Sequence, residues 1–212
     1  MSACSWGLCS GPLGPATGFP FTSWWSEPCP CGFAGKAGHT ATHCLLTTAL
    51  AASERASFLG KIITGGQTGV DRAALDAALD NRFPCGGYCP KGRRAEDGMI
   101  HARYPLQEHA SKDYARRTLE NVLQAHGTLI IHPLELKGGT ALTAQYCHRH
   151  KKPLMLVDAQ RYTVEQAARA TLDFIQEFEV EVLNVAGPRS SQWDGGYPYT
   201  YRCIESIIKA GL

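Results

Sequence analysis

From residue 60 to the end, the sequence predicts an α/β domain built on a doubly wound, mostly parallel sheet with helices on both faces. Strand-type and helix-type patterns alternate along this stretch, which is typical of parallel sheets. Two continuous apolar runs, at residues 127–131 and 153–157, have the length of strands buried on both faces. Glycine-containing loops follow several of the strands. In such sheets, ligands bind in loops at the carboxyl ends of the strands.

The composition sets the broad class of the protein. A chain of 212 residues is long enough for one α/β core and an appendage. The net charge of +2 gives no indication of nucleic-acid binding, and no apolar run approaches the roughly 18 residues of a membrane span. The nine cysteines are scattered and no secretory signal is visible. We therefore expect reduced thiols and a cytoplasmic protein with no nucleic-acid or membrane partner.

Residues 1–59 differ from the rest of the chain. They are rich in Gly, Pro, Ser and Thr and contain four charged residues. We expect an irregular or disordered extension, with one short helix at residues 44–56; alternatively, translation begins nearer Ser57. The segment contains side chains of zinc-ligand type, but their spacing is not that of a usual structural zinc site, so no metal site is predicted. These side chains are Cys29, Cys31, His39, His43 and Cys44.

The first predicted strand ends at Gly65, within the stretch IITGGQTGVDR at residues 62–72. Apolar residues then recur at helical spacing from Val70, which predicts a helix. Glycines allow a turn with positive φ and let a ligand approach the bare amides, and the start of a helix favours an anion. Thr68 is placed to cap this helix, and Asp71 to complete a capping box. The alternative is a well-capped turn with no ligand.

A second short strand is expected over residues 82–88, and another over residues 104–108. Between them lies a basic loop that contains Lys91 and Arg93, which either contributes to a ligand site or is an ordinary solvated loop. Arg72, on the first helix, either faces solvent or pairs with Asp76 four residues on.

The next helix is capped by Ser111 or Asp113 and runs to about Ala125. Its apolar positions, including Leu123, are expected to face inward. Asn121 lies among them, which indicates a buried hydrogen bond that fixes a loop.

Two further strands precede the last helix. The strand at residues 127–131 is followed by a second glycine turn, and Thr140 is placed to cap a helix to about His150. After the strand at residues 153–157, Thr163 and Gln166 form a capping box for a helix to about Phe178. The strand at 180–185 ends in a third glycine loop, and a helix is expected from about Tyr199 to Ala210.

The loops that follow parallel strands should meet at one edge of the sheet. Helix starts and basic side chains would converge there, and they predict a socket for a phosphate or another oxyanion. No catalytic residue is assigned. The candidate binding residues are Gly65, Gly66, Gln67, Thr68, Gly69, Asp71, Arg72, Lys91, Gly92, Arg93, Gly138, Gly139, Thr140, Thr143, Asn184, Gly187, Arg189 and Ser190.

Six ordered motifs between residues 60 and 212 resemble those of the putative molybdenum-cofactor carrier family, which belongs to a Rossmann-like superfamily that includes phosphoribohydrolases. The motifs are GGQTGVDRAALDAA (65–78), CPKGRRAEDG (89–98), RTLENV (117–122), HGTLI (126–130), GGTALT (138–143) and LNVAGPRS (183–190). The resemblance implies a non-catalytic homo-oligomer with a Rossmann-like fold that holds molybdenum cofactor (molybdopterin) as its small anionic ligand. It also implies a molybdoenzyme as acceptor.

Two other functions remain open. The phosphoribohydrolases of this superfamily carry a catalytic glutamate in the motif PGGxGTxxE, whereas this chain reads KGGTALTAQ at residues 137–145. Gln145 cannot act as a general base, although Glu96, Asp97 or Glu108 could supply an acid. A nucleotide-binding or DNA-associated module is the other possibility, and the near-neutral charge argues against nucleic acid.

Overall fold

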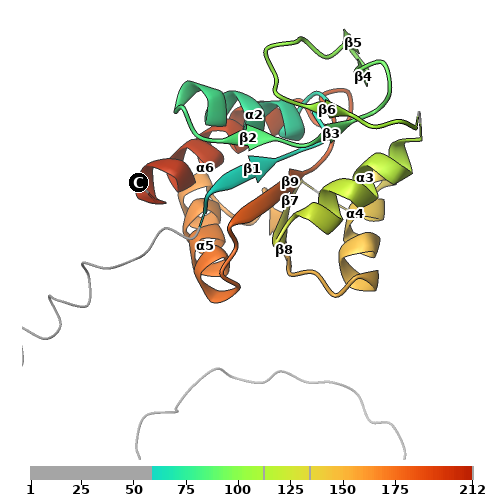
Figure 1. Cartoon of the computed structure of the whole chain (residues 1–212). Coiled ribbons are helices and arrows are strands. Elements are labelled where there is room, and N and C mark those ends of the chain that lie inside the picture. Colours follow the sequence, from blue (N-terminus) through green and yellow to red (C-terminus); the bar gives the residue numbers. More distant parts are fainter. Residues whose placement is uncertain (1–58, 112, 134, 212) are drawn as a thin grey trace, which may run out of the picture. The chain divides into compact units, whose positions relative to one another are not determined.

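The computed structural model describes residues 59–111, 113–133 and 135–211; the predicted extension and its zinc-type side chains lie outside them. Within these residues the predicted doubly wound fold is confirmed. A five-stranded sheet has the order β2-β1-β9-β7-β8, and every pair of neighbours is parallel (Figure 1). Its strands are β1 (Lys61–Ile63), β2 (Cys85–Gly86), β7 (Gly127–His132), β8 (Leu154–Asp158) and β9 (Val182–Ala186).

Helices cover both faces of this sheet. Three helices pack together on one face, with α6 between α2 and α5, and α3 packs against α4 on the other (Figure 1). The right-handed crossovers of parallel strands produce this division, because the chain winds away from β1 in one direction and away from β7 in the other. The helices are α2 (Val70–Asp80), α3 (Tyr114–Gln124), α4 (Gly138–Arg149), α5 (Val164–Glu177) and α6 (Gly196–Gly211).

The main core lies between the sheet and α2, α5 and α6. It is made of aliphatic side chains from the central strands and from the inward faces of these helices, and burial of each stabilises the fold by about 1.5–3 kcal/mol. Completely buried members include Ile62, Val70, Leu129, Ile131, Leu183, Val185, Ile204 and Ile207.

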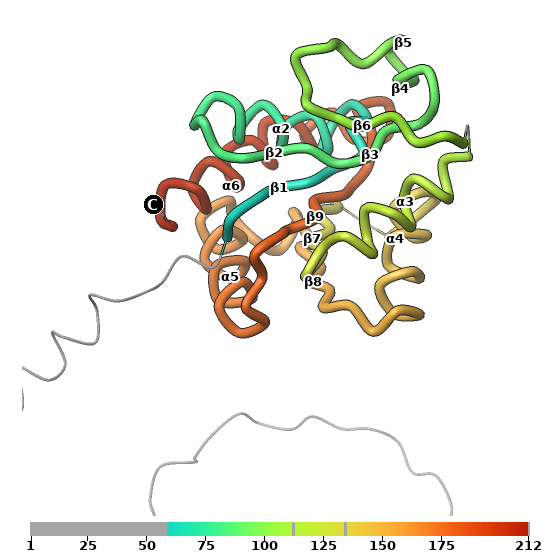
Figure 2. Tube along the Cα trace, in the orientation of Figure 1, coloured from blue at the N-terminus to red at the C-terminus, as the bar shows by residue number. Residues whose placement is uncertain are grey.

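The segment between α2 and α3 leaves the sheet and forms a small unit of its own, visible as the green loop in Figure 2. The sequence predicted one strand over residues 82–88, but the strand is interrupted at Gly87, which has φ +121°. A Cβ there would collide with the backbone of Thr64, so the chain kinks at a glycine. The unit contains β3 (Tyr88–Cys89), β4 (Arg94–Ala95), β5 (Gly98–Met99) and β6 (Gln107–Glu108), paired as β3–β6 and β4–β5.

Several local predictions are confirmed. Asp113 caps α3, with its carboxylate accepting from the Ala115 amide at 2.9 Å. Thr163 and Gln166 form the predicted capping box at the start of α5. The helix α6 was predicted to begin at about Tyr199, but it begins at Gly196. Pro198 does not prevent this earlier start, because it lies in the first turn, where a missing N–H is tolerated.

Two predictions of burial are wrong. Within the described sheet β8 is an edge strand rather than a buried one, and its Leu156 is 47% exposed. Leu123, expected to face inward from α3, is 41% exposed. An apolar run does not distinguish an edge strand from a central one, because a strand at the edge of a sheet can also carry apolar side chains on both of its faces.

Candidate functional site

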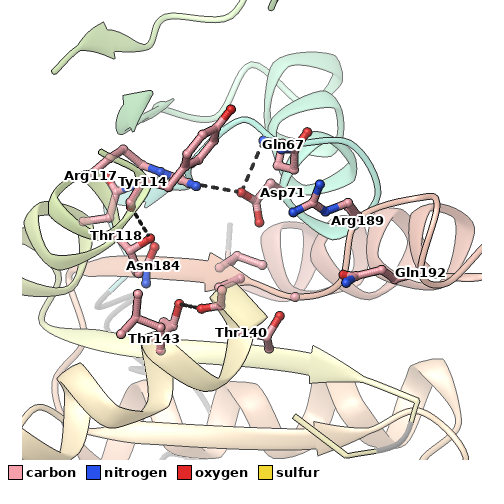
Figure 3. Close-up of a pocket in the computed structure, with 17 residues that line it drawn as sticks. Gln67, Asp71, Tyr114, Arg117, Thr118, Thr140, Thr143, Asn184, Arg189 and Gln192 are labelled. Carbon is pink, nitrogen blue, oxygen red and sulfur yellow. Dashed lines mark hydrogen bonds and ion pairs between the residues drawn. The ribbon is translucent and has the colours of Figure 1, made fainter. Parts of the chain in front are cut away.

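A cleft of about 300 Å³ opens at the carboxyl ends of the strands (Figure 3). It lies where the helices that follow β1 and β7 leave toward opposite faces of the sheet, which is the topological switch point of such folds. Segments that are distant in the sequence meet here: the loop after β1, one face of α3, the start of α4, and the end of β9 with its following loop. The lining residues are Gly65, Gln67, Asp71, Tyr114, Arg117, Thr118, Asn121, Gly139, Thr140, Leu142, Thr143, Asn184, Val185, Ala186, Gly187, Arg189 and Gln192.

Glycines bring two of these loops into contact. Gly69 has φ +76°, and a Cβ on it would come within 2.7 Å of the Pro188 carbonyl oxygen and 2.9 Å of the Ser190 nitrogen. A Cβ on Gly187 would crowd Val70 and the carbonyl oxygen of Ile131. Only glycine fits at these crossings, so the loops after β1 and β9 can form adjacent walls of the cleft.

Arg117 projects from α3 and is largely buried, with 13% of its side chain exposed. Its Nη1 lies 3.7 Å from Oδ2 of Asp71, which is an ion pair but too long for a hydrogen bond. Its Nε is buried and has no hydrogen-bond partner among the described residues. Gly65 makes room for this side chain, since a Cβ on it would overlap the guanidinium.

Asp71 lies in the same cleft and is 6% exposed. Burial raises the pKa of Asp71 to about 6, although the positive charge of Arg117 and the N–H of Gln67 oppose this shift. The predicted capping box is absent: Gly69 is the N-cap of α2, with no side-chain cap bond, and Oδ2 of Asp71 instead accepts from the Gln67 amide at 3.3 Å. The carboxylate therefore stabilises the loop before the helix.

The start of α4 forms the opposite side of the cleft. The helix begins at Gly138, two residues before the predicted cap Thr140, and its N-cap Lys137 makes no side-chain cap bond. The first turn of a helix carries backbone N–H groups without intrahelical acceptors and a partial positive charge. A Cβ on Gly139 would meet nothing within 4 Å, so this glycine is not required by internal packing. The helix start is therefore open toward a ligand.

Asn184, on β9, and Thr143, on α4, are buried polar residues of the cleft. The Asn184 amide donates to Oγ1 of Thr128 at 3.3 Å, and Thr143 donates to the Gly139 carbonyl at 2.9 Å. Asn121 has the structural role that was predicted, because its side chain bonds both the N–H and the C=O of Tyr88 and so joins α3 to β3.

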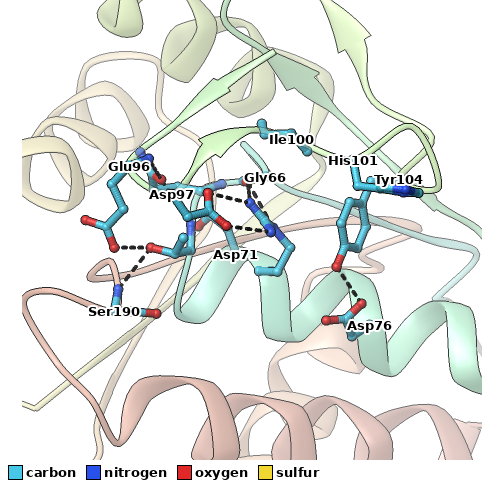
Figure 4. Close-up of polar contacts among 12 residues, drawn as sticks. Gly66, Asp71, Asp76, Glu96, Asp97, Ile100, His101, Tyr104 and Ser190 are labelled. Atoms are coloured by element: carbon cyan, nitrogen blue, oxygen red, sulfur yellow. Dashed lines mark hydrogen bonds and ion pairs between the residues drawn. The ribbon is translucent and has the colours of Figure 1, made fainter.

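Arg72 does not line the cleft, and neither alternative considered for it holds, because its side chain is only 15% exposed and it pairs with Asp97 rather than Asp76. Its guanidinium binds the Asp97 carboxylate, with Nη1 3.2 Å from Oδ2, and donates to the Gly66 carbonyl (Figure 4). Asp76 instead accepts hydrogen bonds from Tyr104 and Tyr197 and contacts Arg103. Arg72 thus holds the segment containing Asp97 against the start of α2.

Glu96 joins the same segment to both glycine loops. Figure 4 shows its contact with the loop after β1, which Ser190 of the loop after β9 also contacts. Its carboxylate accepts from Oγ of Ser191 at 2.6 Å and from the Thr68 hydroxyl, and lies 3.7 Å from Nε of Arg189. Partial burial opposes the shift, but these hydrogen bonds hold the pKa of Glu96 below its usual value. Thr68 also accepts from the Ser190 amide at 3.2 Å, so it joins the two loops and does not cap α2.

The basic loop that was considered for ligand binding lies outside the cleft. Arg93 donates to the carbonyl groups of Ile100, His101, Tyr104 and Leu106, at 2.9–3.0 Å, and so organises its own segment. Lys91 is exposed, and the Gly92 amide donates to Glu108.

The structure therefore divides the candidates into two groups. The cleft includes Gly65, Gln67, Asp71, Gly139, Thr140, Thr143, Asn184, Gly187 and Arg189. Outside its lining lie Gly66, Thr68, Gly69, Arg72, Lys91, Gly92, Arg93, Gly138 and Ser190.

Sequence reasoning missed Arg117, Tyr114, Thr118 and Gln192, which also line the cleft. Arg117 lies four residues before Asn121 on one face of α3, and this polar pair on a half-buried helix was the available signal.

The part of the chain that the structure describes contains no group of three side chains able to hold a metal ion. Cys85, Cys89, Cys147 and Cys203 are free thiols there, and burial raises the pKa of each. Among the described helices, none has both the length and the hydropathy needed to cross a bilayer.

Comparison with known proteins agrees with the fold and the motifs. Residues 62–208 match the model of the circularly permutated YpsA SLOG family. A crystal structure described as a putative molybdenum carrier protein from Syntrophus aciditrophicus SB is 44% identical, with a TM-score of 0.69 over 71% of this chain and 95% of that one. No curated protein matches the chain. With this match covering most of its length, the chain belongs to the circularly permutated YpsA SLOG family.

Proposed function

We propose that the cleft binds a small ligand that carries a phosphate or another oxyanion, and that this ligand is the molybdenum cofactor. The observation that carries the proposal is Arg117. Its guanidinium is largely buried on the wall of the cleft, and its Nε has no acceptor among the described residues. A buried donor without a partner costs about 1–3 kcal/mol, and more when it is charged. The Nε has almost no accessible surface, so an oxyanion in the cleft would act on the rest of the guanidinium and compensate its largely buried positive charge through charge-assisted hydrogen bonds.

Two other donors support an anionic ligand. Arg189 lines the cleft from the loop after β9, where its side chain is 47% exposed and within reach of solvent. The first turn of α4 contributes the backbone N–H of Gly139 and the partial positive charge of the helix start, whereas the Thr140 N–H already donates to the Lys137 carbonyl at 3.2 Å. Donors from α3, α4 and the last loop thus surround one space.

The molybdenum cofactor suits this set of donors. It combines a phosphate with an oxo-metal group, and a phosphate would bind at the start of α4 while oxo groups would accept from Arg117 or Arg189. The similar crystal structure is described as a putative molybdenum carrier protein, which supports a molybdenum-containing ligand for this chain. Carriage rather than conversion implies release to an acceptor molybdoenzyme. We also propose a homo-oligomer in the cytoplasm, to be tested by sedimentation and by imaging of the tagged protein in its host.

The test compares Arg117→Met with Arg116→Met in protein purified from a host that makes the cofactor. Arg116 is the adjacent, exposed residue of α3, so it is a matched control for the loss of one positive charge. We expect molybdenum and the cofactor mass in the wild-type protein and in Arg116→Met, and at least a tenfold loss in Arg117→Met. Elemental analysis and native mass spectrometry measure both.

Gly139→Leu gives a second, independent test. Because a Cβ at this position meets open space, the variant should fold normally while its side chain blocks the cleft. Gln145→Leu, at an exposed position further along the same helix, is its control. Cofactor retained in both Arg117→Met and Gly139→Leu would refute the proposed site.

A nucleoside-monophosphate hydrolase is the second candidate, because Asp71 is a carboxyl group with a pKa of about 6 in a cleft, which is typical of a catalytic acid or base. Gln145, at the position of the phosphoribohydrolase glutamate, is exposed and does not line the cleft. Incubation with nucleoside monophosphates decides the matter: release of free base that is lost in Asp71→Asn would establish the hydrolase.

A further inference from the structure

A carboxylate is an unexpected neighbour for an anion. Asp71 lies on the wall of the cleft proposed to bind an oxyanion, is 6% exposed, and lies 3.7 Å from Nη1 of Arg117. Asp71 does not cap α2, although its Oδ2 accepts from the Gln67 amide at 3.3 Å and so stabilises the loop before that helix. The inference drawn from it rests on the proposed function, since it concerns which oxyanions the cleft accepts.

The charged groups around Asp71 come from several elements. Arg72 is on its own helix and Arg117 on α3, and both favour the ionised carboxylate. Arg189 lines the same cleft from the loop after β9, and it is paired with Glu96 of the β4–β5 segment. The lining residues of α4 are Gly139, Thr140, Leu142 and Thr143, none of which titrates. Asp71 is therefore the acidic group that a bound anion would meet.

An ionised carboxylate can only accept hydrogen bonds. A fully deprotonated tetrahedral anion beside it brings acceptors and negative charge alone, so both repulsion and unmatched lone pairs oppose binding. An oxyanion that retains one O–H can donate to the carboxylate while its other oxygens bind the guanidinium and the helix start. The charge-assisted O–H···O⁻ hydrogen bond is among the stronger kinds.

We propose that Asp71 makes the cleft select oxyanions that carry a proton over deprotonated oxyanions of the same shape and charge. The class selected comprises hydrogenphosphate and phosphate monoesters in their singly protonated form. Sulfate, which differs from hydrogenphosphate by the missing O–H, is the class rejected. Asp71 is thus a specificity-determining residue of the cleft.

The experiment measures inorganic phosphate and sulfate binding to the full chain by calorimetry at pH 7.5. In the wild-type protein we expect phosphate to bind at least about tenfold more tightly than sulfate. In Asp71→Asn the amide can donate to either anion, so the ratio should fall to within about threefold, with sulfate binding more tightly than in the wild type. Asp80→Asn, at the exposed end of the same helix, should keep the wild-type ratio.

A pH series on the wild-type protein gives a test that needs no variant. Sulfate stays a dianion between pH 8 and pH 5.5, so a change in its affinity reports on the protein. As pH falls through the region where Asp71 gains its proton, the carboxyl becomes a donor, and sulfate affinity should rise about tenfold. The same series on Asp71→Asn separates this rise from the titration of other groups, and should show less than a threefold change.

The outcomes separate this inference from the proposed function. Equal phosphate and sulfate affinities in the wild-type protein, or an unchanged ratio in folded Asp71→Asn, would overturn the selectivity and leave the oxyanion cleft intact. Binding of neither anion to the wild-type protein or to Asp71→Asn would contradict the cleft itself. If thermal unfolding shows that Asp71→Asn is not folded, the selectivity is tested by the wild-type protein alone, through its ratio of phosphate to sulfate affinity and the pH dependence of its sulfate affinity.

Discussion

Asp71 shows how one buried carboxyl group affects the whole domain. Burial raises its pKa from 3.8 to about 6, even with Arg117 beside it. Between about pH 4 and pH 6 the native state retains a proton that the unfolded state has lost. The free energy of unfolding therefore falls as pH rises through this window, by up to about 3 kcal/mol at about 1.4 kcal/mol per pKa unit. The ionised carboxylate is maintained at the expense of stability, as is common for groups at functional sites.

Asp71→Asn should therefore stabilise the protein at neutral pH. The amide resembles the protonated carboxyl and can still accept from the Gln67 amide. We expect the free energy of unfolding at pH 7.5 to rise by about 2–3 kcal/mol, and the two proteins to converge near pH 4. Urea unfolding at several pH values measures this, with Asp80→Asn as the control. An Asp71→Asn protein that is less stable than the wild type at pH 7.5 would contradict the account.

At the scale of the elements, α3 matters because it carries Arg117 and Tyr114 into the cleft in its first turns. Its start is fixed by Asp113, and the start of α5 is fixed by the Thr163 capping box. Each of the two caps contributes about 1 kcal/mol to the free energy of unfolding. Only the first belongs to a helix whose early residues line the cleft.

Asp113→Ala and Thr163→Ala should consequently separate stability from binding. Each should lower the free energy of unfolding by about 1 kcal/mol. Asp113→Ala should also weaken phosphate binding by up to about fivefold, because the first turn of α3 must then be ordered by the ligand. Thr163→Ala should leave phosphate binding unchanged. Equal effects of the two variants on affinity would show that the position of α3 is not set by its cap.

At the scale of the whole molecule, the β4–β5 segment holds the two glycine loops together. Glu96 contacts Thr68 on one loop and Ser191 on the other. These loops form adjacent walls of the cleft, although Glu96 itself does not line it. The small unit inserted between α2 and α3 thus stabilises the shape of the site from outside.

Glu96→Ala should loosen these loops without unfolding the sheet. We expect hydrogen exchange at the amides of Ser190 and Ser191 to accelerate by about tenfold or more, because local opening then costs fewer charge-assisted hydrogen bonds. Exchange in β7 should remain unchanged. Glu108→Ala is the control, since Glu108 accepts from Gly92 in the same segment but contacts neither loop. Unchanged hydrogen exchange at both serines in Glu96→Ala would show that the two loops remain in contact without the hydrogen bonds of Glu96.

The sequence by itself determined the layered parallel sheet and the convergence of glycine loops at one edge. Apolar runs such as residues 127–131 and the alternation with helical patterns are local signals that identify the strands and helices. The right-handedness of parallel crossovers then decides on which face of the sheet each helix lies. Nine of the eighteen candidate residues line the cleft, because the topology brings their loops to one edge of the sheet, but it does not decide which side chains face the cleft. The caps at Asp113 and Thr163 were predictable for the same reason, because both partners lie within one turn of the chain.

Only the tertiary structure decided which charged groups are available to a ligand. Arg72 and Arg93 looked like ligand-binding residues, yet packing directs their donors to Asp97 and to backbone carbonyls. Arg117 looked like an ordinary helical residue, yet packing buries it beside Asp71 with an unused donor. The charge of a side chain can be read from the sequence, but its free hydrogen-bonding capacity depends on acceptors brought close by distant parts of the chain.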